Sequence, residues 1–145
     1  MKHLIAALSL MASPALAEFV HVEAEGNVAE VTDRLEAAVQ EAGATVFARV
    51  NHAEGAASVD MDLAPAELLI FGNPMLGTPA MQADIRAGLM LPLRVLVANM
   101  DGETHLIYED VAGMMDGLDV PLDAEYAQKM GGALATLTGK AAMAQ

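Results

Sequence analysis

The sequence has no cysteine and no tryptophan, and only three Phe and two Tyr among its 145 residues. Without cysteine, the chain forms no disulfide and offers no thiol nucleophile and no thiolate ligand for a metal. Apolar packing must therefore come from Leu, Val, Ala and the eleven Met residues. A domain formed by this chain depends on its hydrophobic core alone for stability.

Basic residues are also scarce. The chain carries 7 Lys and Arg against 20 Asp and Glu, a formal net charge of −13. Nucleic-acid binding needs Lys and Arg side chains that neutralise phosphates, so we expect no nucleic-acid partner. Anionic lipid would repel such a surface. Solubility is a sufficient explanation for an acidic excess of this size.

The N-terminal segment has the pattern of a secretory signal peptide. The apolar run Leu4–Met11 follows a short basic start, and small residues stand at the two positions that signal peptidase reads, Ala15 and Ala17. The run is too short to span a bilayer, which takes about 20 apolar residues. We predict cleavage after residue 17, a single α+β domain over residues 18–145, no transmembrane span after cleavage, and a periplasmic or secreted protein. The alternatives are an uncleaved anchor or a frayed cytoplasmic start.

The first half of the remaining chain reads as strand, helix, strand and strand. Asn27 and Glu30 have the spacing of a capping box, and Gly43 is placed to end the helix that they begin. Simple alternation puts Val46, Ala48 and Val50 on one face of the second strand, and Phe47 and Arg49 on the other. The predicted elements are strands over 19–23, 45–50 and 67–71, a helix over 28–42, and a loop or single helical turn over 51–57.

The second half begins with two chain breakers, Gly72-Asn73-Pro74 and Gly77-Thr78-Pro79. Thr78 and Pro79 read as the N-cap and first residue of a helix, and Met81, Ile85 and Leu89 would form its apolar stripe. Asp101-Gly102 is a two-residue hairpin signal. It joins predicted strands over 93–98 and 104–108, which precede a turn or short helix over 111–117 and a helix over 124–137 capped by Asp123.

This order, β-α-β-β-α-β-β-α, predicts an α+β fold: a two-layer sandwich with a mainly antiparallel sheet and helices on one face. The other face of the sheet would be open or used to form a homodimer.

The sequence resembles the family called domain of unknown function 302. The resemblance implies a compact α+β fold like one repeat of the TATA-box-binding protein, a dimer, and no established activity. This chain has Asn51 where the family has Asp, so a charged Asp–His pair at His52 is not expected. The resemblance runs from about residue 22 to 108 and is carried by Val50-Asn51-His52-Ala53, by Leu69–Pro74 with Gly77–Gln82 (the pattern FGNP-x-x-GTP-x-MQ), and by Leu91–Val97 leading to Tyr108.

His52 is the first candidate for chemistry. It follows a strand and precedes small residues, and imidazole binds a proton, a metal or an anion near neutral pH. With Asn51 beside it, a hydrogen-bonding role is easier to picture than a charged pair. The alternative is a histidine that caps the next turn or packs in the core.

The stretch Gly72–Thr78 is the second candidate. Its backbone N–H groups would lie near a helix N-terminus, which favours anions, and Asn73 and Thr78 would add side-chain contacts. No lysine follows Gly77 as a Walker loop requires. The alternative is a structural corner, because a tight turn by itself explains Gly, Asn and Pro.

Arg94 lies among apolar neighbours in a predicted strand. It would pair with a buried carboxylate, bond to loop carbonyls, or hold an acidic ligand; the first two roles are the commoner ones in a core. Scattered methionines with His21, His52 and His105 raise the question of Cu(I). No clustered ligand motif is present, so core packing explains the methionines, and we predict no metal and no cofactor.

The function that follows is a small exported domain that binds a small molecule, an anionic ligand or a protein partner at a cleft formed by His52 and the 72–78 loop. The ligand-binding residues would be Asn51, His52, Gly72, Asn73, Gly77, Thr78 and Arg94. Two alternatives stay open: an enzyme with His52 as general acid or base, and a periplasmic metal-handling protein.

Overall fold

The computed structural model describes residues 19–144, so the predicted signal peptide lies outside the described residues. The fold is α+β, with one five-stranded antiparallel sheet in the order β1-β5-β4-β3-β2. Its strands are β1 (Phe19–Ala24), β2 (Thr45–Asn51), β3 (Ala66–Gly72), β4 (Leu93–Met100) and β5 (Glu103–Glu109). Its helices are α1 (Val28–Glu41), α2 (His52–Ala57), α3 (Pro74–Ala83), the 3-10 helix η1 (Ile85–Leu89), α4 (Val111–Met114) and α5 (Glu125–Ala142).

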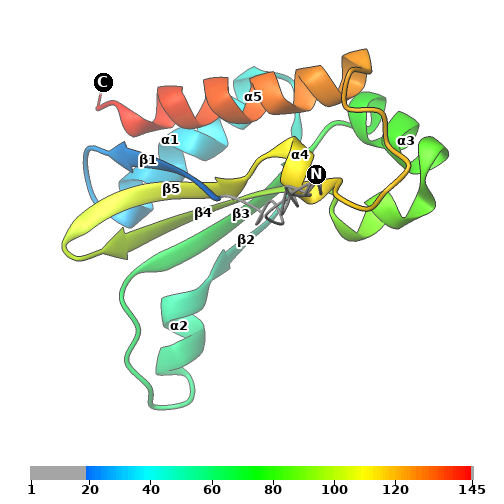
Figure 1. The fold of residues 1–145 in the computed structure, drawn as a ribbon. Helices are drawn as coiled ribbons and strands as arrows, with labels where there is room; N and C mark the ends of the chain where they lie inside the picture. The colour runs from blue at the N-terminus through cyan, green and yellow to red at the C-terminus, as the bar shows by residue number, and fades with distance from the viewer. Residues whose placement is uncertain (1–18, 145) are drawn as a thin grey trace, which may run out of the picture.

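The long helices α1 and α5 pack side by side on one face of the sheet (Figure 1). The core lies between the two layers, and the predicted two-layer sandwich is confirmed. Alternation along each strand sends every second side chain into this core. Leu69, Val95 and Leu106 from the strands and Leu35 and Leu134 from the helices are each at most 1% exposed there.

The N-terminus of α1 is the predicted capping box. Asn27 Oδ1 accepts a hydrogen bond from the Glu30 N–H at 3.0 Å, and Glu30 Oε2 accepts one from the Asn27 N–H at 3.1 Å. Two of the four backbone donors that a helix start leaves free are thereby satisfied. The helix ends before Gly43, whose φ of +75° explains why glycine stands there.

The face assignment predicted for β2 is correct for Ala48 and Val50 but wrong for Val46, which lies on the other face with Arg49. Val46 pairs with Phe71 and Ala48 with Ile70, so a β-bulge leaves Phe47 without a cross-strand partner. The alternation of side chains between the two faces shifts by one residue at the bulge. Arg49 therefore lies on the face covered by α1, where it bonds to Asp33.

The helix predicted to have Thr78 as its N-cap starts five residues earlier. Asn73 is its N-cap and Pro74 its first residue, so Pro79 lies in the helix interior. Both Asn-Pro and Thr-Pro fit the start of a helix, and the earlier one begins α3 directly where β3 ends. The predicted stripe is also wrong, since Ile85 and Leu89 belong to η1 and are 78% and 76% exposed.

The terminal helix α5 begins at Glu125, with Ala124 rather than the predicted Asp123 as its N-cap and no side-chain capping bond. It continues to Ala142, and Met130, Leu134 and Leu137 line its buried face. Although α5 has 18 residues, none of the helices within 19–144 combines the length and apolarity that crossing a membrane takes.

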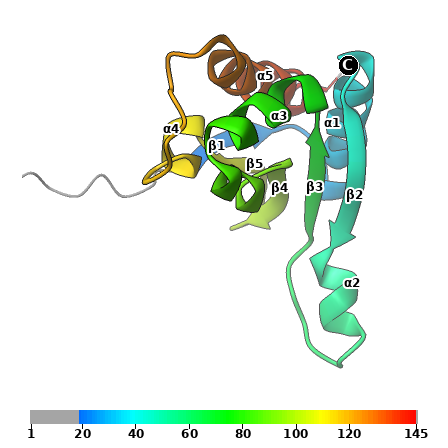
Figure 2. The ribbon, with the colours of Figure 1, turned by 90° about the vertical axis from the view of Figure 1, so that its right-hand side faces the viewer.

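Two segments project from the sandwich at opposite ends of the β2–β3 pair (Figure 2). At one end α2 follows β2 and extends beyond the sheet, and at the other α3 and η1 connect β3 to β4 (Figure 1). The predicted hairpin between β4 and β5 is confirmed: Asp101 and Gly102 have φ values of +54° and +95°, as the tight two-residue turn requires.

Candidate functional site

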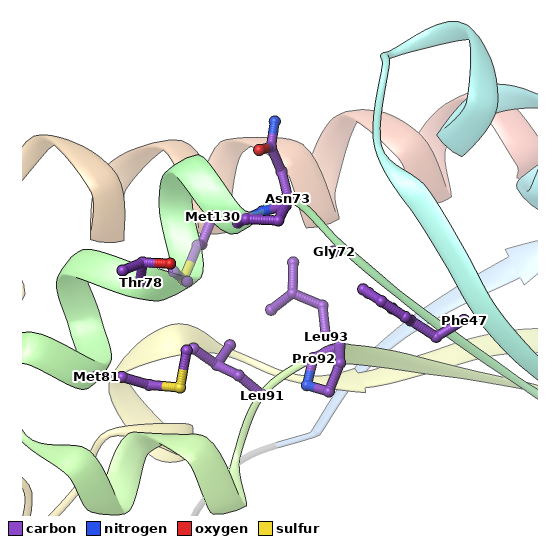
Figure 3. Close-up of a pocket in the computed structure, with 11 residues that line it drawn as sticks. Phe47, Gly72, Asn73, Thr78, Met81, Leu91, Pro92, Leu93 and Met130 are labelled. Atoms are coloured by element: carbon purple, nitrogen blue, oxygen red, sulfur yellow. The ribbon is translucent and has the colours of Figure 1, made fainter.

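A mostly apolar pocket of about 280 Å³ lies at the corner where β3 passes into α3 (Figure 3). Met130 of α5 and Leu93 of β4 are 2% and 5% exposed, and they form its buried part. Phe47, which is 56% exposed, stands at its edge. The pocket is lined by Phe47, Gly72, Asn73, Pro74, Gly77, Thr78, Met81, Leu91, Pro92, Leu93 and Met130.

Local backbone features of β2 and β3 help to keep this space free. The bulge releases the Phe47 side chain from the alternation of β2, so the ring reaches the pocket (Figure 3). Gly72 lies between this ring and Pro92: a Cβ at position 72 would stand 3.4 Å from Pro92 Cβ and 3.6 Å from Phe47 Cε2. A larger side chain at position 72 would therefore take up part of the pocket.

Three of the backbone donors at this corner, where an anion was predicted to bind, are already used. The N–H of Met75 bonds to Asn73 Oδ1 at 2.9 Å, and the N–H groups of Leu76 and Gly77 bond to the Asn73 carbonyl at 2.9 and 3.0 Å. The Asn73 amide points away from the other lining side chains (Figure 3), so the Thr78 hydroxyl is the polar side-chain group left for a ligand among the lining residues. The arrangement therefore suits an apolar ligand with one uncharged polar group better than an anion.

The predicted cleft between His52 and the 72–78 loop is not formed. Thr45 pairs with Gly72 at one end of the β2–β3 pair, and Asn51 pairs with Glu67 at the other. With about 3.3 Å per strand residue, the ends lie roughly 20 Å apart. His52 is exposed at the start of α2 and has no hydrogen-bond partner in the part of the chain that the structure describes.

Two more predicted site residues also lie away from the pocket. Asn51 is the N-cap of α2, where its Oδ1 accepts a hydrogen bond from the Glu54 N–H at 3.0 Å. Arg94 pairs with Ile70 across the sheet, and its exposed side chain is on the face that the helices leave uncovered. Arg94 has no ion pair with the acidic residues between 19 and 144, so the expected buried partner is not present there.

The pocket contains seven further residues that were not predicted as site residues. Four of them, Met81, Leu91, Leu93 and Met130, look like ordinary core residues in the sequence. The breaker pattern did point to the corner itself, but a pocket wall made of apolar side chains has no distinctive sequence signal. Within residues 19–144, no three His, Asp or Glu side chains are grouped to hold a metal ion.

A model of the family described as "Domain of unknown function DUF302" matches residues 20–137. The chain belongs to this family. A DUF302 protein from Bacillus stearothermophilus, described as an uncharacterized conserved protein, has a crystal structure that matches with a TM-score of 0.73 over 85% of this chain and 97% of that one. At 21% sequence identity, this similarity shows the DUF302 fold alone.

Curated relatives carry a different kind of name. The chain is 38% identical over 130 residues to "Fluoride-specific ion channel FluC 1" of Brucella suis biovar 1 and, at the same identity, to the protein of that name from Brucella abortus biovar 1. The matches cover 89% of this DUF302 chain and 50% and 47% of those proteins. The chain therefore spans about half the length of the curated relatives it matches.

Proposed function

We propose that this DUF302 domain binds a small, mostly apolar molecule, or an apolar side chain of a partner, in the pocket at the β3–α3 corner. The observation that carries the proposal is the pocket itself, about 280 Å³ with apolar walls and an uncharged polar group at Thr78. Concave, largely apolar sites with a few polar groups are the usual form of small-molecule sites. The proposal also includes export of the domain, which the signal-peptide pattern of the N-terminal segment supports.

An alcohol with an apolar chain is a suitable probe, because it combines an apolar body with one hydroxyl. We expect 1-octanol to perturb the methyl NMR signals of Met81 and Met130, which line the pocket. The Met61 methyl, on the exposed segment after α2, should not respond. A uniform response of all three methyls would indicate non-specific binding and contradict the proposal.

Gly77 allows the pocket to be filled from within a helix. A Cβ at this position would make an ordinary contact, 3.7 Å from Leu91 Cδ1, so Gly77→Leu should place its side chain in the pocket without a backbone clash. Gly132→Leu is the matched control, because Gly132 also lies in a helix but has nothing within 4 Å of its Cβ position. Octanol binding should be lost in the first variant and kept in the second. Equal binding to both would place the ligand elsewhere.

A second candidate function is a role beside a fluoride channel. The observation that favours it is the match of nearly the whole chain to half of the proteins named as fluoride-specific ion channels. An uncharged apolar surface for such a partner is available on α3 and η1. Met75, Ile85 and Leu89 are each more than 75% exposed there, and from Gly72 to Leu93 the only charged residues are Asp84 and Arg86, which pair with each other.

Growth in fluoride tests this second function. Loss of the domain should lower the fluoride concentration that cells tolerate, and replacing Met75, Ile85 and Leu89 by Ser should have the same effect. The matched control replaces Val59, Met61 and Leu63, apolar residues after α2 that are each more than 50% exposed, by Ser. Unchanged fluoride tolerance after deletion of the domain would reject the channel role and leave the pocket proposal standing.

A further inference from the structure

A second cavity, of about 400 Å³, lies at the opposite end of the sheet from the β3–α3 pocket, where α1 begins. Four polar side chains line it: Asn27, Asn51, Glu67 and Asn99. They come from the start of α1 and from three neighbouring strands. The site proposed above shares no residue with this cavity, so the two can be tested separately.

Strand pairing explains why these polar residues meet. Asn51 and Glu67 are direct partners across β2 and β3, and Glu67 is the partner of Val97 across β3 and β4. Asn99 follows Val97 by two residues and so lies on the same face. That face is the one covered by α1. This end of the core is therefore polar, whereas the middle of the core is filled by Leu and Val.

Glu67 is the buried charge of this group. Its side chain is 10% exposed, and its Oε2 accepts a hydrogen bond from Arg49 Nε at 2.6 Å. The other oxygen, Oε1, accepts no hydrogen bond from any residue between 19 and 144. Oε1 is not sealed from solvent, and because Glu67 lines the cavity, water or a ligand in the cavity can donate to this oxygen.

The local charge favours a cation. The Arg49 guanidinium faces three carboxylates: it bonds to Glu67 and Asp33, each at 2.6 Å, and lies 3.5 Å from Glu36. Burial works to lower the pKa of Arg49, but hydrogen bonds to Glu67 and Asp33 outweigh it and raise the pKa. The group keeps two negative charges in excess, within a protein of net charge −13 that attracts cations.

The asparagines supply further acceptors. Asn27 Oδ1 and Asn51 Oδ1 each accept one backbone hydrogen bond, from Glu30 and Glu54 at 3.0 Å. An amide oxygen has a second lone pair, which is available to a donor in the cavity. A primary ammonium group has three N–H donors and a compact positive charge. We infer that this cavity binds the primary ammonium group of a small organic amine, with Glu67 Oε1 and asparagine amide oxygens as its acceptors.

Three probes with the same hydroxymethyl group separate charge from size: ethanolamine, ethylene glycol and glycolate. Titrations at constant ionic strength should show saturable shifts of the side-chain amide NMR signals of Asn27, Asn51 and Asn99 with ethanolamine alone. Equal shifts with ethylene glycol would indicate a site for hydroxyls or water and overturn the inference. Unmoved amide signals with all three probes would do the same.

Glu67→Gln removes the charge and nearly preserves the shape, so ethanolamine should bind about tenfold more weakly or worse, as expected for the loss of a charge-assisted hydrogen bond. Asp33→Asn is the matched control. It makes the same change in net charge and also removes a partner of Arg49, but Asp33 is 69% exposed and does not line the cavity. Its affinity should stay within about threefold, the size of a screened surface effect.

Loss of Glu67 also removes a partner of Arg49, so Glu67→Gln could fail to fold. Asn99→Ala is a second variant, because Asn99 lines the cavity and otherwise accepts only a long 3.3 Å hydrogen bond from Gly102. It should weaken ethanolamine binding and leave the fold intact. Binding unchanged in Asn99→Ala and in any folded Glu67→Gln would place the amine outside this cavity.

Discussion

Among single residues, Asp84 makes the densest set of polar contacts. Its carboxylate accepts hydrogen bonds from Arg86 Nη2 at 2.6 Å and Nε at 3.0 Å, from the Arg86 N–H, and from the Asp119 N–H at 3.0 Å. The residue is 9% exposed. Through Asp119 it ties η1 to the segment between α4 and α5, which is distant in the sequence, so one side chain fixes the place of two irregular segments.

Asp84 should make stability depend on pH. Hydrogen bonds from Arg86, and then from the Asp119 N–H, hold the pKa of its carboxyl below the usual range. A carboxyl whose pKa is lowered by folding stabilises the protein above its unfolded pKa, near 3.9, and this contribution is lost as the pH falls further. Thermal melts from pH 7 to pH 3 should therefore show falling stability below about pH 5.

The variant Asp84→Asn isolates this contribution. It should melt several degrees lower at pH 7 and lose less stability on acidification than the wild type. Asp123→Asn is a suitable control, since Asp123 is exposed and accepts no hydrogen bond from residues 19–144. If both variants kept the acid dependence of the wild type, other carboxyls would be responsible for it.

At the scale of elements, periodicity and caps were enough to predict the order of strands and long helices. The capping box at Asn27, the glycine after α1 and the Asp101-Gly102 turn each act within a few residues, so the sequence shows them directly. The bulge at Phe47 is different. Nothing local distinguishes it from simple alternation, and it depends on how β2 pairs with β3.

The candidate site was predictable only in part. Gly72, Asn73, Gly77 and Thr78 do line one pocket, because they belong to one continuous turn. His52 was placed with them on the strength of residue type. Antiparallel pairing of β2 with β3 puts the end of one strand beside the start of the other, so His52 and Gly72 had to lie at opposite ends. The pocket wall from β4 and α5 depends on tertiary packing.

Pro79 provides a test of where α3 begins. An interior proline removes one backbone hydrogen bond, here the one that residue 79 would donate to the Met75 carbonyl. Pro79→Ala should therefore stabilise the protein by about 1–3 kcal/mol in denaturant unfolding. Pro74→Ala, at the first helical position, should be neutral or slightly destabilising. A helix starting at Pro79 would instead make both substitutions close to neutral.

For the whole molecule, the main asymmetry is that α1 and α5 cover one face of the sheet and leave the other uncovered (Figure 1). A row of cross-strand partners crosses the uncovered face: Val50, Leu68, Leu96 and Ile107, with His21 at the edge. Four of these five side chains are apolar. Such a row on a sheet surface is typical of contact with another apolar surface. The predicted homodimer would supply that surface from a second copy of the chain.

We therefore expect a homodimer that buries this row, because a two-fold axis can set the same apolar surface of two copies face to face. Light scattering after size exclusion should give twice the mass of the chain, and Leu96→Asp should give a folded monomer, because Leu96 lies in the middle strand of the row. Ala135→Asp, on the exposed side of α5, adds the same charge away from the sheet and should leave the dimer intact. A wild-type protein that stays monomeric at high concentration would contradict the dimer, and a dimer unaffected by Leu96→Asp would place the interface on another surface.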